Sequence, residues 1–396
     1  MRWSPLRCAI AAGIPVVALA AGGCSTVSRS YSPFDSTGYL RSQYAERVGA
    51  AAAAELTVPF ELDDEIRAVA EETISAAGSE RRRIDEILEL VFGALDLRYS
   101  LVPTRSAVAT YRDREGNCLS FVNLFVGLAR QLRLNAFYVE VQDYQRWSYQ
   151  HGTVVSHGHI VAGLRIDGEL STFDFLPYRP KSYRDFNPID DLRSAAHYFN
   201  NLGAEALIAG RLEEGRRLLE RAVALSPAFD KAQNNLGVAL MRLGEAEAAA
   251  AILERGLASS PDSVPLLSNL ARAYQLLGRE KEALAHLSRI EELDQANPFL
   301  YVYRGERALA AGDLDQALEY MVKALRRETE LPEVHLGLVK VYLALGEVDR
   351  ARHHVERALK LDATHWEALK YAAMLAAREA AGGSAKSTIE PEGRQR

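Results

Sequence analysis

Three residues of this chain have the types and the order of a thiol-dependent acyl-transfer site: Cys118, His159 and Asp174. In such a site a thiolate attacks a carbonyl carbon, a histidine exchanges the proton, and a carboxylate orients the imidazole. The chain contains only three cysteines, so neither a disulfide framework nor a four-cysteine zinc site explains Cys118. The surrounding sequence indicates how these three side chains are positioned.

Cys118 is expected at the start of a helix. The segment 118–132 is dense in apolar residues, which predicts a largely buried helix. Asn117 precedes it and is a favoured N-cap residue. The positive end of the helix dipole favours a thiolate in the first turn. Helices are also expected within 62–76 and 79–97, followed by a loop over 100–117.

A β-hairpin is expected to bring His159 and Asp174 together. The runs 154–166 and 169–176 flank an Asp-Gly pair, which is typical of a two-residue type I′ turn. This turn fixes the register and makes the two residues diagonal neighbours on one face, with Cβ atoms about 7 Å apart. His157 shares that face but lies too far along the strand to meet the carboxylate.

A metal site is the alternative interpretation of this region. His151, His157 and His159 could form a histidine cluster, but no fourth ligand with suitable spacing accompanies them. The acyl-transfer chemistry that we expect instead requires neither a metal nor an organic cofactor.

A helix-start cysteine followed by histidine and aspartate on adjacent strands resembles the transglutaminase-like superfamily of papain-like enzymes. The matching segments are REGNCLSFVNLFVGLARQLRL, SHGHIVAGLRI and STFDFLP. The resemblance implies an α+β domain, expected over 56–190, with Cys118 as nucleophile, His159 as base and Asp174 as orienting group. An aromatic residue often follows the family's histidine by two positions, and here it is a valine. This departure favours a cysteine protease, amidase or other acyl-transfer relative over a protein-crosslinking transglutaminase.

The second half of the chain is repetitive, and its period of 34 residues resembles the tetratricopeptide repeat. A glycine that adopts positive φ ends the first helix of each pair, and a small residue lets the second helix pack closely. We expect an all-α solenoid of five repeats and a capping helix over 196–380, then a disordered tail over 381–396. The recurring glycines are Gly210, Gly244, Gly278, Gly312 and Gly346, and the small residues are Gly215, Ala249, Ala283, Ala317 and Ala351.

A solenoid of this kind offers a concave groove to a peptide or a partner protein. The residues expected to face the groove are Asn200, Asn234, Arg242, Arg272 and Lys340. The alternative is that these positions are merely solvated polar residues. A basic clamp for a C-terminal carboxylate is not evident, so the sequence does not identify the partner.

The N-terminus carries targeting signals. Residues 1–23 combine Arg2 and Arg7 with an apolar stretch too short to span a bilayer, as in a signal peptide. The next residues, Ala-Gly-Gly-Cys, resemble the lipobox of bacterial lipoproteins, which implies a lipidated Cys24. The absence of aspartate after this cysteine implies the periplasmic face of the outer membrane. An ordinary cleaved signal is the alternative. Residues 24–55 are expected to form a tether.

The charge balance of the whole chain argues against nucleic-acid binding, since a formal net charge of −6 offers no basic footprint for phosphates. The sequence thus predicts a lipid-anchored envelope enzyme that performs thiol acyl transfer, with repeats that recruit a substrate or partner. The alternative is a non-catalytic adaptor, in which both halves only bind partners.

Overall fold

The structure is a computed structural model. It describes residues 36–75, 77–150, 153–166, 169–175, 186–293, 298–329, 331–361 and 365–386. The expected signal peptide, Cys24 and the first part of the tether lie outside the described residues, as do residues 387–396. The chain forms two compact units: the first extends to Pro261, and the second begins at Asp262 and also takes the short segment Tyr149–Val154.

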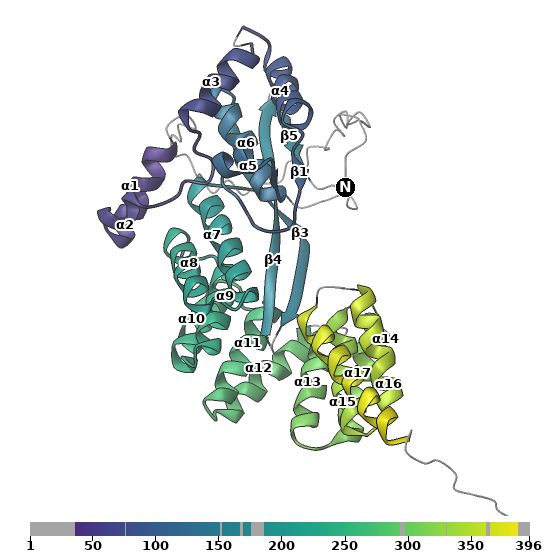
Figure 1. Cartoon of the computed structure of the whole chain (residues 1–396). Coiled ribbons are helices and arrows are strands. Elements are labelled where there is room, and N and C mark those ends of the chain that lie inside the picture. The colour runs from purple at the N-terminus through teal and green to yellow at the C-terminus, as the bar shows by residue number, and fades with distance from the viewer. Residues whose placement is uncertain are drawn as a thin grey trace, which may run out of the picture. The chain divides into compact units, whose positions relative to one another are not determined.

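The repeat region consists of five helical hairpins and a final helix, which confirms the expected all-α repeats (Figure 1). The first unit contains α7 (Asp191–Ile208) with α8 (Leu212–Leu225), and α9 (Asp230–Arg242) with α10 (Ala246–Ser259). The second unit contains α11 (Val264–Leu276) with α12 (Glu280–Leu293), α13 (Pro298–Ala310) with α14 (Leu314–Arg327), α15 (Pro332–Ala344) with α16 (Val348–Leu361), and α17 (Trp366–Lys386).

The recurring glycines make the turns between paired helices. All five have positive φ, from 71° to 85°, a conformation that residues with a side chain rarely adopt. The small residues also act as expected: a Cβ atom on Gly215 would lie 2.7 Å from Leu207 Cδ2. The four alanines at equivalent positions are fully buried. Helix α17 continues to Lys386, so the tail expected from residue 381 begins with helix.

The rest of the first unit combines helices with an antiparallel sheet. The helices are α1 (Ser36–Val48), α2 (Ala50–Ala54), α3 (Asp64–Thr73), α4 (Glu80–Glu89) continued by the π-helical turn η1 (Leu90–Ala94), α5 (Ala107–Asp113) and α6 (Cys118–Gln131). The strands are β1 (Arg98–Tyr99), β2 (Glu115–Gly116), β3 (Ala136–Gln150), β4 (Thr153–Ile166), β5 (Glu169–Phe173) and β6 (Phe186–Ile189). Strands β1 and β2 pair in parallel, and the four-stranded sheet has the order β5-β4-β3-β6.

Helix α6 is buried along nearly its whole length, as its apolar sequence predicts. The Phe125 ring on α6 lies 5.1 Å from the Phe173 ring and 5.6 Å from the Phe175 ring. These two rings flank Asp174 in the sequence, so packing against α6 fixes the chain on both sides of this carboxylate. The expected loop over 100–117 is only partly irregular, because α5 forms within it and Ser106 caps its N-terminus.

The expected tether is corrected by the structure, because it folds from Ser36 onward. Helix α1 buries Leu40 completely and leaves Tyr44 only 4% exposed, and both belong to the core shared with α6. The Arg47 guanidinium at the end of α1 donates hydrogen bonds to the carbonyl oxygens of Ala224 and Leu225 at the end of α8. A mostly polar helix thus packs through one apolar side.

The expected boundary between an α+β domain ending at residue 190 and repeats starting at 196 is not a structural boundary. One continuous core includes Phe125 of α6 and Phe199 of α7. The Arg130 guanidinium on α6 makes a bidentate pair with Asp191 on α7, with N···O distances of 2.8 and 2.9 Å. The first two hairpins therefore belong to the same compact unit as the sheet, and a separate α+β domain is not confirmed.

No helix in the described part of the chain is both long enough and apolar enough to cross a membrane.

Candidate functional site

Cys118 is the first residue of α6 and is half-buried. Asn117 is the N-cap, as expected: its backbone is extended, and its Oδ1 accepts hydrogen bonds from the backbone N–H and the hydroxyl of Ser120, each at 3.0 Å. The cap satisfies one of the N–H groups that the first turn of a helix leaves without intrahelical partners. The thiol therefore sits at the positive end of a well-anchored helix.

The structure brings His159 and Asp174 into direct contact. His159 Nε2 lies 3.0 Å from Asp174 Oδ1. Strands β4 and β5 pair from Ile166–Glu169 onward, which is the register expected from the Asp-Gly pair. The imidazole is almost completely buried, whereas the carboxylate side chain keeps 24% of its surface exposed.

Cys118 also reaches this histidine. Burial by itself lowers the pKa of His159, but hydrogen bonds to Asp174 and Cys118 and the negative charges of these groups raise it to about 9. This pKa favours the imidazolium form of the ring at neutral pH. Since Nε2 is directed at the carboxylate, Nδ1 is the ring atom that can exchange a proton with the thiol. In this arrangement the imidazole of His159 can exchange a proton with the thiol of Cys118 while the carboxylate of Asp174 orients the ring.

The other two histidines of this region do not enter the described site. His151 lies outside the described residues, and the side chain of His157 is not described. Within the ranges that the structure describes, no three residues of metal-binding type are grouped so that they could hold an ion.

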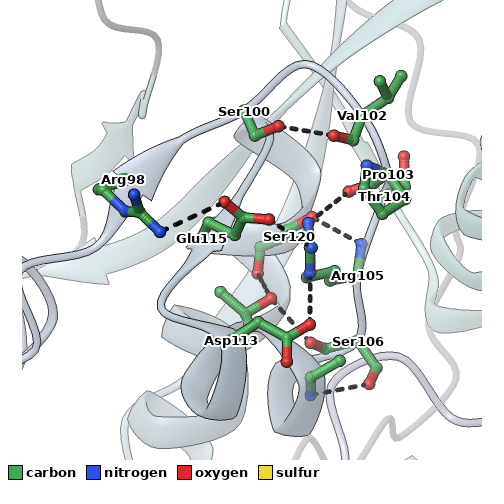
Figure 2. Close-up of polar contacts among 12 residues, drawn as sticks. Arg98, Ser100, Val102, Pro103, Thr104, Arg105, Ser106, Asp113, Glu115 and Ser120 are labelled. Atoms are coloured by element: carbon green, nitrogen blue, oxygen red, sulfur yellow. Dashed lines mark hydrogen bonds and ion pairs between the residues drawn. The ribbon is translucent and has the colours of Figure 1, made fainter. Parts of the chain in front are cut away.

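Residues before Cys118 form a hydrogen-bonded loop that the sequence did not reveal. Figure 2 shows Arg105 at its centre, with its guanidinium paired to Asp113 at 2.8 Å and to Glu115 at 2.6 Å. The backbone N–H of Arg105 donates to Ser120 Oγ at 2.8 Å. The loop is thus tied to the first turn of α6. The only sequence signal was the Asn-x-x-Ser spacing of the cap, since the remaining contacts join residues far apart in the chain.

A second buried polar cluster joins the sheet to the first two hairpins. Glu140 on β3 is 2% exposed, and its carboxylate lies 2.9 Å from Lys231 Nζ and 3.3 Å from Arg193 Nη2. Burial alone would raise the pKa of Glu140, but the neighbouring His197, Lys231 and Arg193 hold it well below its usual range. Burial also lowers the pKa of His197 to about 4. This cluster fixes helices α7 and α9 on the sheet.

Two of the expected groove residues are used inside the repeat stack. Asn200 and Asn234 are 3% and 1% exposed. Asn235 Nδ2 donates to Asn200 Oδ1 at 2.9 Å, and Asn234 Nδ2 donates to Asn235 Oδ1 at 3.2 Å. Their amide groups hydrogen-bond to one another between successive hairpins.

The three basic groove residues differ in their surroundings. Arg242 Nη1 donates to the carbonyl oxygen of Leu207 at 2.7 Å, and burial lowers the pKa of Arg242. Lys340 forms ion pairs with Glu306 at 3.0 Å and Glu367 at 3.2 Å. Arg272 is the one exposed residue among the five that were expected to face the groove, all of which the structure describes.

A family model of the tetratricopeptide repeat matches residues 206–265, 244–300 and 308–377, so the chain carries repeats of this family. Tetratricopeptide repeats in general stack into extended surfaces that bind protein or peptide partners. No curated protein sequence matches this chain.

Several solved structures are similar to the repeats. A thermophilic tetratricopeptide repeat protein of Thermus thermophilus is 24% identical with a TM-score of 0.41, and the match covers 46% of this chain and 98% of that one. The pilF protein of Pseudomonas aeruginosa is 23% identical with a TM-score of 0.36, over 50% of this chain and 89% of that one. YrrB, described as having an unusual peptide-binding site, is 19% identical with a TM-score of 0.28, over 44% and 91%.

Proposed function

We propose that this chain is a thiol acyl-transfer enzyme of the transglutaminase-like class, acting as a cysteine protease, amidase or acyltransferase. The observation that carries the proposal is the contact of the His159 imidazole with the Asp174 carboxylate at 3.0 Å, and Cys118 is also among the groups that raise the pKa of this ring. A histidine with a purely structural role needs only one hydrogen-bond acceptor for its ring. Nucleophile, base and orienting carboxylate in series are what acyl transfer requires.

In the proposed reaction, the sulfur of Cys118 forms a bond to the carbonyl carbon of an amide. His159 donates a proton to the leaving amine as the C–N bond breaks, and Asp174 holds the ring in place. Water then attacks the thioester, His159 takes a proton from this water, and the acid leaves as the C–S bond breaks. An amine in place of water would give transfer instead of hydrolysis. No metal or organic cofactor takes part.

The first turn of α6 supplies the proposed stabilisation of the oxyanion. The backbone N–H of Cys118 is at the helix N-terminus, where N–H groups have no intrahelical acceptor. A donor fixed at the site of developing charge stabilises the tetrahedral intermediate more than the substrate.

The repeats are proposed to bind a protein or peptide that is a substrate or an assembly partner. Exposed Arg272 is the groove residue best placed to contact this partner, because the other four expected groove residues are engaged within the chain. With full-length Cys118→Ala protein as bait, Arg272→Glu should weaken retention of the partner from a cell-envelope extract. Equal retention by both baits would exclude Arg272 from the interface.

The proposed location is the cell envelope, with a lipid on Cys24 as the anchor at the periplasmic face of the outer membrane. The support is the sequence from the apolar stretch to Ala-Gly-Gly-Cys. Multiple acyl chains anchor a protein stably where one alone is marginal. The intact mass of membrane-extracted protein should correspond to a chain that begins at Cys24 and carries acyl groups. A mature chain without added acyl mass would exclude the anchor.

The catalytic proposal is tested with p-nitrophenyl acetate. The sulfur of Cys118 should displace p-nitrophenolate and gain an acetyl group, seen as a burst of colour and as added mass on the peptide that contains Cys118. His159→Ala should slow the burst by about a hundredfold, as expected for loss of general acid–base help. A burst no faster than that of free cysteine, or unaffected by His159→Ala, would contradict the proposal.

The second candidate is a non-catalytic adaptor, which the family match to the repeats favours. An adaptor needs the repeats but not the proton exchange between Cys118 and His159. If the adaptor is correct, the chain binds its partner, Cys118 acylates as an ordinary thiol, and Cys118→Ala leaves partner-dependent phenotypes unchanged. The two candidates are therefore separated by the same burst experiment.

A further inference from the structure

Helix α7 contacts the loop that precedes Cys118 through one carboxylate, that of Glu205. Glu205 Oε1 accepts a hydrogen bond from the backbone N–H of Thr104 at 2.8 Å and another from the Thr104 hydroxyl at 2.7 Å. Thr104 is only 3% exposed, so these bonds are shielded from water. A residue of the first repeat hairpin thus anchors the loop that precedes α6.

The same threonine hydroxyl reaches the cap of α6. Asn117 Nδ2 donates to Thr104 Oγ1 at 2.7 Å, while Asn117 Oδ1 accepts from the backbone N–H of Ser120 at 3.0 Å. The amide of Asn117 is therefore held at both ends. Cys118 is the next residue, so the orientation of this amide determines how the first turn of α6 begins.

The direction of these hydrogen bonds follows from the carboxylate. An ionised carboxylate only accepts, so the Thr104 hydroxyl must donate to Glu205. The hydroxyl oxygen then accepts from Asn117 Nδ2, which leaves Asn117 Oδ1 free to cap the Ser120 N–H. Without the carboxylate, the hydroxyl can donate to Asn117 instead, and the flipped amide would face the Ser120 N–H with its NH₂ group and lose the cap.

We propose that Glu205 is a positioning residue for the Cys118 nucleophile, acting through Thr104 and the Asn117 cap. The inference rests on the proposed acyl-transfer function and adds a role for the first repeat hairpin in it. Glu205 touches neither the thiol nor the imidazole. Its effect is to hold the first turn of α6, and with it the sulfur and the backbone N–H of Cys118, in the geometry that reacts.

Charged and titratable groups near Glu205 come from the loop, from its own helix and from the turn after it. Arg105 lies on the loop, Tyr198 on α7, and Arg211 follows α7. Burial is the largest influence and raises the pKa of Glu205 above its usual value, while the hydrogen bonds from Thr104 and the charges of Arg105 and Arg211 offset part of this increase. The two arginines favour the ionised form of this carboxylate, in which it only accepts hydrogen bonds.

The test compares acetylation of Cys118 by p-nitrophenyl acetate in five full-length variants, one of which combines two substitutions. Glu205→Ala should slow it by about tenfold or more, since small misplacements of reacting groups are costly. Glu205→Gln should restore the rate, because its amide oxygen still accepts both bonds from Thr104. Thr104→Val should slow the rate as Glu205→Ala does, and combining the two should add little. Glu214→Ala is the matched control, a half-buried carboxylate that pairs with Arg211.

Hydrogen exchange distinguishes positioning from loss of fold. In Glu205→Ala, the Ser120 amide should exchange faster while the amides in the middle of α6 stay protected. Equal acetylation rates in Glu205→Ala and Glu214→Ala, or no rescue by Glu205→Gln, would overturn the positioning role while the proposed function stands. A wild-type chain without His159-dependent acetylation would instead overturn the proposed function, and the positioning role with it.

Discussion

At the scale of single residues, the candidate site depends on the charge state of His159. Its buried ring would be neutral if it stood alone, and the contacts with Asp174 and Cys118 raise its pKa to about 9. The unfolded chain has a histidine pKa of about 6.5. The protonated ring therefore stabilises the folded state fully below about pH 6.5, and this contribution is lost as the pH rises through 9.

Replacing Asp174 by asparagine tests this residue-scale statement. Asp174→Asn removes the carboxylate charge, so the pKa of His159 should fall by about one unit or more. The free energy of unfolding should decrease more at pH 6 than at pH 10, because only the protonated ring loses its partner. An NMR titration of His159 and urea unfolding at both pH values measure the two effects. An unchanged titration midpoint for His159 would show that the contact with Asp174 does not raise the pKa of this histidine.

At the scale of elements, the sequence predicted the features that depend on residues close together in the chain, namely helix turns and strand register. The glycines at 34-residue spacing all have the positive φ that the turns require. Strands β4 and β5 pair in the register that the Asp-Gly sequence predicted, and this register joins His159 to Asp174. Helix α1 could not be foreseen, because its sequence is mostly polar and its burial depends on the distant helix α8. The contact of Thr104 with Glu205 joins residues 101 positions apart and has no local signal.

A substitution in α1 tests the correction of the expected tether. Leu40 is completely buried, so Leu40→Ala should destabilise the first unit by about 2–5 kcal/mol, as large-to-small changes in cores do. Tyr39 is its neighbour and 40% exposed, so Tyr39→Ala is the matched control and should cost much less. Urea unfolding measures both. Equal and negligible effects would show that residues 36–48 behave as a tether after all.

At the scale of the whole molecule, the first two repeat hairpins belong to the unit that contains Cys118, and the remaining repeats form a second unit. The sequence placed the division at residues 190–196, because the repeat pattern begins there. In the structure the first unit ends at Pro261, because buried contacts join the first two hairpins to the rest of this unit. The ion pair of Arg130 with Asp191 is one of these contacts. A repeat period shows where similar helices occur, but it does not show which of them share a core with a neighbouring sheet.

Breaking that ion pair tests the unit division. Asp191→Asn leaves the buried guanidinium of Arg130 without its partner charge, which typically costs about 3–5 kcal/mol. Hydrogen exchange should then accelerate together in α6, α7 and α8, while α13 to α16 keep their protection. Acceleration in α7 and α8 without α6 would show that the first hairpin is independent of the sheet.

The most direct test of the central claim is the pH dependence of Cys118 alkylation by iodoacetamide in the wild type and in His159→Ala. An ordinary thiol reacts slowly below its pKa of about 8.5. If His159 and Cys118 form an ion pair, the wild-type rate at pH 6 exceeds that of His159→Ala by about tenfold or more. This advantage should disappear as the pH rises through 9 and the imidazolium loses its proton. Superimposable profiles for the two proteins would contradict the assignment of Cys118, His159 and Asp174 as a catalytic triad.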